Sequence, residues 1–84
     1  MRLPIIKHTL SFIDENDEDW VQETIELLEY MADAKGIKDE ELDVIGELLS
    51  NFYGALEVQK EIKAGKASKE ALNDFMKRVT GSIN

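Results

Sequence analysis

The sequence predicts an all-α protein, a compact up-and-down bundle of four helices in which the third is long and central. Apolar residues recur at the helical spacing of three and four in four separate stretches. No stretch alternates like a strand, and no Asn-Gly or Asp-Gly hairpin turn occurs. The connections are short, which favours antiparallel neighbours. Because 84 residues can build one core at most, residues 1–84 are predicted to form a single domain.

The first two helices are indicated by their ends as well as by their apolar faces. Pro4 suits the first turn of a helix that stops in the polar run of residues 14–17. Asn16 or Asp17 can cap a second helix over roughly residues 17–34. Gly36 can supply the left-handed residue that ends it. Its apolar side chains fill one wide arc: Trp20, Val21, Thr24, Ile25, Leu27, Leu28, Met31 and Ala32.

The third helix is expected to organise the fold. Asp39 can cap it, and no strong helix breaker follows before Ala64 and Gly65, so it would span about 37 Å. It carries two apolar stripes about 100° apart, which predicts neighbouring helices on two sides. Ser68 can cap a fourth helix that Gly81 closes.

Small residues line a third side of this long helix. Gly46, Ser50 and Gly54 follow one another at intervals of four, and Tyr53 borders them. A glycine within a helix costs roughly 1 kcal/mol relative to alanine, so a close approach by another helix is one explanation. We therefore predict a self-association interface at Gly46, Ser50, Tyr53 and Gly54. The alternative is that Gly54 marks a kink and that Gly46 is merely tolerated.

Charge is distributed unevenly along the chain. The net charge is −8, and residues 14–56 hold fourteen acids against Lys35 and Lys38. Such a balance argues against direct binding to the nucleic-acid backbone. A ladder of carboxylates on the second helix could attract a basic protein partner, or could simply be a solvated face. The predicted partner face consists of Glu23, Glu26, Glu29 and Asp33.

No pattern for catalysis or cofactor binding is present in the sequence. The chain has no Cys and a single His, His8, so thiol chemistry and a histidine-based metal site are not expected. A calcium-loop interpretation of residues 14–25 fails because Asp19 stands where the loop needs Gly. We expect no enzyme activity, no cofactor and no metal. With neither a membrane span nor a signal peptide in the sequence, a cytoplasmic location is predicted.

Several segments resemble a known protein family. These are the start of the chain at residues 3–8, the stretch at residues 12–19, the long run at residues 38–55, and residues 69–79. Together they are similar to a family of short, all-helical bacterial proteins of unknown function. The resemblance covers nearly the whole chain and implies no activity, cofactor or catalytic residue.

The sequence thus favours a small non-enzymatic interaction or regulatory module. It is expected to self-associate, as a dimer in the first instance, and to bind a basic protein partner through its acidic helix face. The alternative is an accessory subunit of a larger enzyme, or a protein that binds a divalent metal through carboxylates.

Overall fold

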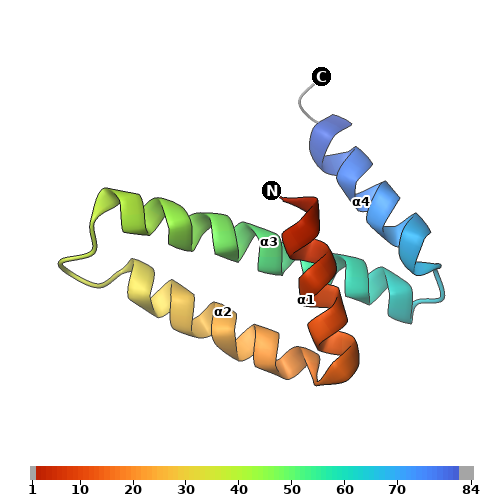
Figure 1. The fold of residues 1–84 in the computed structure, drawn as a ribbon, viewed down its shortest axis with the longest axis horizontal. Coiled ribbons are helices and arrows are strands. Elements are labelled where there is room, and N and C mark those ends of the chain that lie inside the picture. Colours follow the sequence, from red (N-terminus) through yellow and green to blue (C-terminus); the bar gives the residue numbers. More distant parts are fainter. Residues whose placement is uncertain (1, 82–84) are drawn as a thin grey trace.

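The protein is a bundle of four α-helices. A computed structural model describes the backbone of residues 2–81 and the side chains of residues 2–79. The helices are α1 (Leu3–Glu15), α2 (Glu18–Ala32), α3 (Asp39–Lys63) and α4 (Ser68–Gly81), and this part of the chain contains no strand. Helix α3 is the longest and contacts each of the other three (Figure 1). The predicted fold class is therefore confirmed.

The helix ends follow local side-chain chemistry. Asp17 caps α2, since its carboxylate accepts a hydrogen bond of 3.1 Å from the Asp19 amide. The prediction that Asp39 caps α3 is wrong by one residue. Lys38 holds the cap position, and the Glu41 carboxylate reaches back to accept its amide at 3.0 Å. Gly36 has the left-handed conformation that was expected, with a φ of 90°, but it does not end the helix. Helix α2 stops at Ala32 with Asp33 as its C-cap, three residues before Gly36.

The hydrophobic core lies along the second half of α3. One cluster joins α1, α3 and α4 around Ile6, Val58 and Phe75. The other joins α1 and α2 to α3 through Ile13 and Val21, against which partly buried side chains of α3 pack. Both clusters use α3 from residue 49 onward, so this half of the helix is covered by its neighbours.

A buried asparagine fixes the start of α1 on α3. The Asn51 side chain is fully buried. Its carbonyl oxygen accepts a hydrogen bond of 2.7 Å from the Arg2 amide, and its nitrogen donates to the Glu47 carbonyl at 2.7 Å. The amide of Arg2 precedes α1 and has no partner within that helix, so Asn51 satisfies a backbone donor that the helix leaves unpaired.

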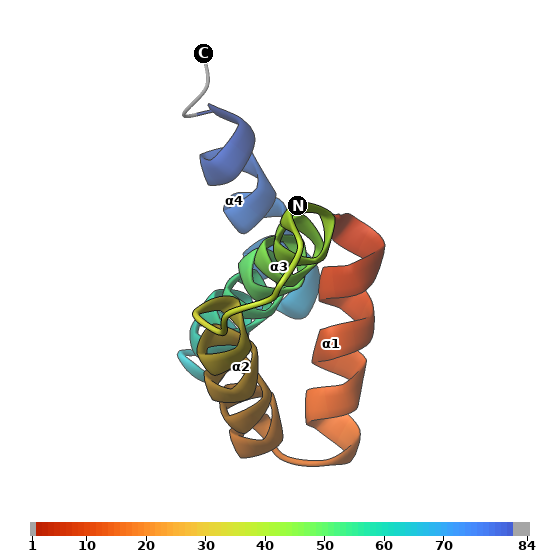
Figure 2. The same cartoon turned by 90° about the vertical axis from the view of Figure 1, so that its left-hand side faces the viewer.

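The molecule is flat. It measures 43 × 35 × 18 Å, and the last dimension corresponds to two layers of helices at most. Its radius of gyration is 13.8 Å, whereas a compact domain of this length is expected near 12 Å. Figure 2 shows α1 on one side of the layer formed by α2 and α3. Within residues 2–81, no helix is both long and apolar enough to cross a membrane.

Candidate interaction surface

The end of the α2–α3 hairpin far from α1 and α4 has almost no core of its own. Among residues 27–48, Ile45 is the one buried side chain. In Figure 1 this part of the hairpin extends away from both α1 and α4. Because a helix normally buries its apolar stripe against a second layer, this end of the hairpin has one layer where a domain needs two.

Large apolar side chains gather on the side of the hairpin that α1 partly covers. On α2, Trp20, Thr24, Leu27 and Met31 recur at intervals of three and four residues, so they share one side of the helix. Thr24 lines a groove together with side chains of α1. On α3, Val44 precedes Leu48 by one turn and shares its side of the helix. We call this surface the open face. Its exposed fractions are Trp20 56%, Leu27 58%, Met31 38% and Val44 59%.

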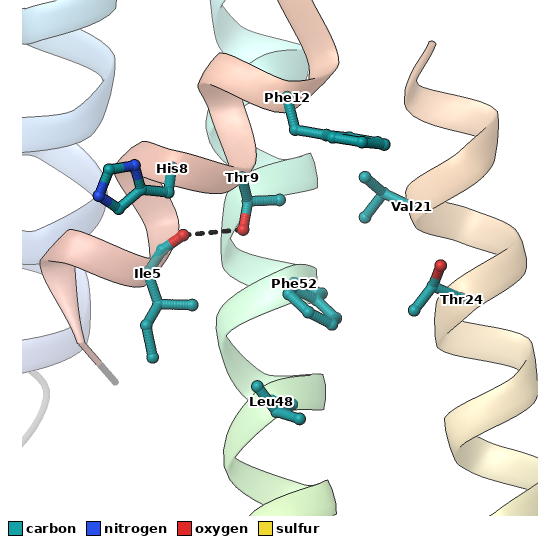
Figure 3. Close-up of a pocket in the computed structure, with 8 residues that line it drawn as sticks. All are labelled: Ile5, His8, Thr9, Phe12, Val21, Thr24, Leu48 and Phe52. Atoms are coloured by element: carbon teal, nitrogen blue, oxygen red, sulfur yellow. Dashed lines mark hydrogen bonds between the residues drawn. The ribbon is translucent and has the colours of Figure 1, made fainter. Parts of the chain in front are cut away.

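A groove connects the open face to α1. Its volume is about 430 Å³, within the range of small ligand and side-chain pockets. Figure 3 shows the Phe12 ring of α1 directed toward Val21 of α2, with Phe52 and Leu48 of α3 below them in the view, while His8 lies at the edge. The groove is lined by Ile5, His8, Thr9, Phe12, Val21, Thr24, Leu48 and Phe52.

The groove presents an apolar surface because its hydroxyl groups are used internally. Thr9 donates to the Ile5 carbonyl at 2.7 Å, and Thr24 donates to the Trp20 carbonyl at 2.8 Å. At one end the rings of Phe12 and Trp20 pack with centroids 5.9 Å apart. Such a lining can receive apolar side chains but offers few groups that could orient a polar substrate.

The structure separates the small residues that the sequence placed in one interface. Gly54 is buried, and a Cβ added to it would lie 2.9 Å from Phe75 Cζ and 3.5 Å from Ile6 Cδ1. The close approach predicted at Gly54 therefore exists, but α1 and α4 of the same chain make it. Gly54 is covered within the chain and lies outside any surface that Gly46 and Tyr53 could form.

The remaining three residues of that prediction lie away from the groove. Gly46 is exposed, with nothing within 4 Å of an added Cβ, and it lies about 200° around α3 from Leu48. Ser50 is partly buried. Tyr53 is 45% exposed and donates its hydroxyl to the Glu29 carboxylate. That hydrogen bond, with a smaller effect of desolvation, raises the pKa of Tyr53 above its usual value.

The four acids of the predicted partner face are all exposed, Glu23, Glu26 and Glu29 on α2 and Asp33 immediately after it. Glu29 of the predicted partner face accepts a hydrogen bond from the hydroxyl of Tyr53, which belongs to the predicted self-association interface. The structure therefore joins one residue of each predicted surface. Among the described residues, no ion pair reaches Glu23, Glu26 or Asp33. The ion pairs that form involve other acids: Lys63 with Glu18, Lys66 with Asp74 and Glu61, and Arg78 with Glu57 and Glu61.

Side chains that could ligate a metal lie apart from one another in the described part of the chain. There, no three carboxylate or histidine side chains converge closely enough to hold a metal ion.

Sequence reasoning missed the open face. The apolar residues of the second helix form one wide arc, and the sequence alone does not divide that arc between neighbouring helices. In the structure Val21 and Ile25 face α3, whereas Trp20 and Leu27 turn toward the side of α1. The available signal was the width of the arc, because an arc that wide needs two neighbours. Helix α1 crosses the hairpin at an angle (Figure 1) and covers part of the arc, and Leu27 stays 58% exposed.

Comparison with protein families identifies the chain. The model of a family of unknown function, DUF6952, matches residues 1–84, so the chain belongs to that family. Neither the curated proteins nor the solved structures compared with the chain gave a match. The resemblance to a family of unknown function is therefore confirmed.

Proposed function

We propose that this member of the DUF6952 family is a non-enzymatic interaction module that engages a partner through the open face. The observation that carries the proposal is the exposure of Trp20, Leu27 and Val44 on one side of a hairpin that has no second layer there. Contiguous apolar surface of this kind is characteristic of interaction sites, because leaving it in water is unfavourable. The adjoining groove offers a recess for apolar side chains of the partner.

The total exposed area supports the same proposal. The chain exposes 6017 Å², whereas a compact monomer of 9.6 kDa is expected to expose about 5,100 Å². The excess, about 900 Å², is close to the roughly 800 Å² that each partner buries in a protein interface of standard size. One ordinary interface would therefore bring the exposed area to that of a typical folded protein.

A second copy of the chain is the second candidate occupant, and the same area favours it. Self-association was the first expectation from the sequence, through Gly46, Ser50, Tyr53 and Gly54. Gly54 is covered within the chain, which leaves Gly46, Ser50 and Tyr53 for such an interface. These residues face away from the open face, so the two routes to a dimer are separable by substitution. Gly46→Leu should abolish a dimer formed through the glycine side, and Val44→Glu should abolish one formed through the open face.

Site-specific photocrosslinking in producing cells tests the proposed function. A photoreactive amino acid at position 27 should give a discrete crosslinked product, since this side chain lies on the open face. The same amino acid at position 30 is the matched control, because Tyr30 is 80% exposed on the same helix but about 60° around from Leu27. The position-27 product should disappear when Val44→Glu is added on α3.

Two results would contradict the proposed function. One is equal crosslinking from positions 27 and 30. The other is a position-27 product that survives Val44→Glu. Leu27 and Val44 are both more than half exposed in the wild-type chain, so replacing them should leave the helices folded. Circular dichroism of the variants checks this.

A further inference from the structure

We infer that the open face binds an amphipathic helix of another protein whose polar edges are basic. This inference rests on the proposed function and names the partner class of the same surface. It follows from three features of the hairpin: an apolar floor of helical length, acidic edges on both sides of that floor, and a net negative charge that disfavours a second copy.

The floor has the dimensions of a helix-binding groove. From Trp20 to Met31 the apolar stripe of α2 runs for eleven residues, about 17 Å. Phe12 of α1 packs on Trp20 at one end of the stripe, so a bound helix would cover the Leu27 and Met31 end and reach the edge of α1. Val44 and Leu48 of α3 form the other side of this floor. Two parallel ridges separated by a shallow trough receive the apolar side chains of a helix at intervals of three and four residues. Helix α1 crosses the hairpin on this same side (Figure 1), so a bound helix would lie beside α1 in the same layer.

Acidic side chains border the floor on both helices. Glu23 lies three residues after Trp20 and four before Leu27, on the outer edge of α2. Glu40 lies four residues before Val44, on the outer edge of α3. Both are exposed, and neither takes part in an ion pair with another described residue. A helix seated on the floor would place its flanking side chains beside these carboxylates, where Lys and Arg are favoured and Asp and Glu are disfavoured.

A second copy of the chain does not match this surface. Residues 27–48 carry seven acids against Lys35 and Lys38, so two copies face to face would bring like charges together. The basic helix of the chain, α4, already buries its apolar face around Phe75 in its own core. A partner with a free basic amphipathic helix has the charge that a second copy lacks.

Fluorescence titration of the intact chain with a designed peptide tests the inference. The probe is a tryptophan-free helical peptide with Leu at the core-facing positions of a helix and Lys elsewhere. Trp20 is the single tryptophan and lies on the open face, so its emission should shift to shorter wavelength and saturate as the peptide covers it. A peptide with Glu in place of Lys, and one with Ser in place of Leu, should both fail to produce the shift.

Substitutions on α2 separate docking from general attraction between opposite charges. Leu27→Glu adds a negative charge, so it should strengthen a purely electrostatic association. Docking predicts the opposite, a loss of about tenfold or more in affinity, because the apolar contact of one leucine is removed. Tyr30→Glu adds the same charge on the same helix outside the floor and should bind at least as tightly as the wild type. Binding that Leu27→Glu leaves unchanged or strengthens overturns the inference, and so does the absence of any saturable shift.

Light scattering of the free chain distinguishes a failure of this inference from a failure of the proposed function. A monomer of 9.6 kDa is expected, because the open face awaits another protein. A stable dimer that Leu27→Glu dissociates would overturn the inference and uphold the proposed function, since the open face would then be occupied by a second copy. If neither Leu27→Glu nor Val44→Glu changes peptide binding, crosslinking or association, both the inference and the proposed function are wrong.

Discussion

The two halves of α3 have the same kind of sequence and opposite surroundings. From residue 49 onward the helix is packed by α1, α2 and α4, and Val58 is fully buried. Before residue 49 the one buried side chain of α3 is Ile45, and Val44 is 59% exposed. Both halves are α-helical, so helix formation does not distinguish them. What differs is the second layer, which the chain supplies for one half and which, under the proposed function, a partner supplies for the other.

This contrast is expected to appear as a gradient of local stability. Amides protected by buried packing exchange with solvent only through large openings, whereas those in thinly packed segments exchange through local ones. The hairpin end around residues 27–48 should therefore exchange faster than α3 beyond residue 49. A bound partner should slow exchange in the hairpin end first.

The largest expected effect comes from the same substitution at two valines of α3. Val58→Ala should lower the free energy of unfolding by about 2–3 kcal/mol, because it removes buried methyl groups and leaves a cavity. Val44→Ala should change it by a few tenths of a kcal/mol, and in the stabilising direction, because alanine has the higher helix propensity. Urea denaturation of both variants checks this. Equal losses at the two positions would mean that the first half of α3 is covered as well.

Asn51 tests the junction between the two halves. Replacing it by alanine should cost about 1–3 kcal/mol, because the Arg2 amide and the Glu47 carbonyl both lose a buried partner. The start of α1 should loosen with it, since Asn51 holds the residue that precedes that helix. Thermal unfolding measures the loss, and hydrogen exchange in the first turn of α1 locates it. An Asn51→Ala variant as stable as the wild type would show that α1 is held by apolar packing alone.

Alanine substitutions at the two glycines of α3 test the same comparison. Their effects on the free energy of unfolding should be smaller and opposite in sign. At Gly46 an added methyl group meets open space, so Gly46→Ala should stabilise the protein by up to about 1 kcal/mol through helix propensity. At Gly54 the methyl would lie 2.9 Å from the Phe75 ring, so the gain in propensity is opposed by overpacking of about 1–3 kcal/mol. Gly54→Ala should therefore be neutral to destabilising. The denaturation midpoints of the Gly46→Ala and Gly54→Ala variants test this prediction. Stabilisation at both sites would show that the Phe75 ring moves aside freely.

The sequence predicts the helices well and their packing partners less well. Caps and breakers such as Asp17 and Gly36 act within one turn, so they are readable from neighbouring residues. The helix spacing likewise shows that α3 needs neighbours on two sides. It does not show where along α3 each neighbour lies, because that depends on the angle at which α1 crosses. For this reason the sequence predicts an interface at Gly54, although Phe75 covers it, and it does not separate Trp20 and Leu27 from the part of their arc that faces α3.

Charge gives the smallest of the expected effects and separates the two ends of the molecule. At the covered end, Lys66 pairs with Asp74 at 2.8 Å, and this hydrogen bond holds the pKa of Asp74 below its usual value of 3.8. Because the folded-state pKa is the lower one, the contribution of Asp74 to stability is present above the unfolded-state pKa. It is lost as the pH falls through the folded-state value.

Asp74→Asn should therefore lower the melting temperature slightly at neutral pH, and the difference from the wild type should close in acid. Lys66→Met should produce the same convergence, because it removes the cation that causes the shift. Melting curves that stay parallel across the acid range would show that the pair contributes nothing to folding. The two ends of α3 would then differ in their packing alone.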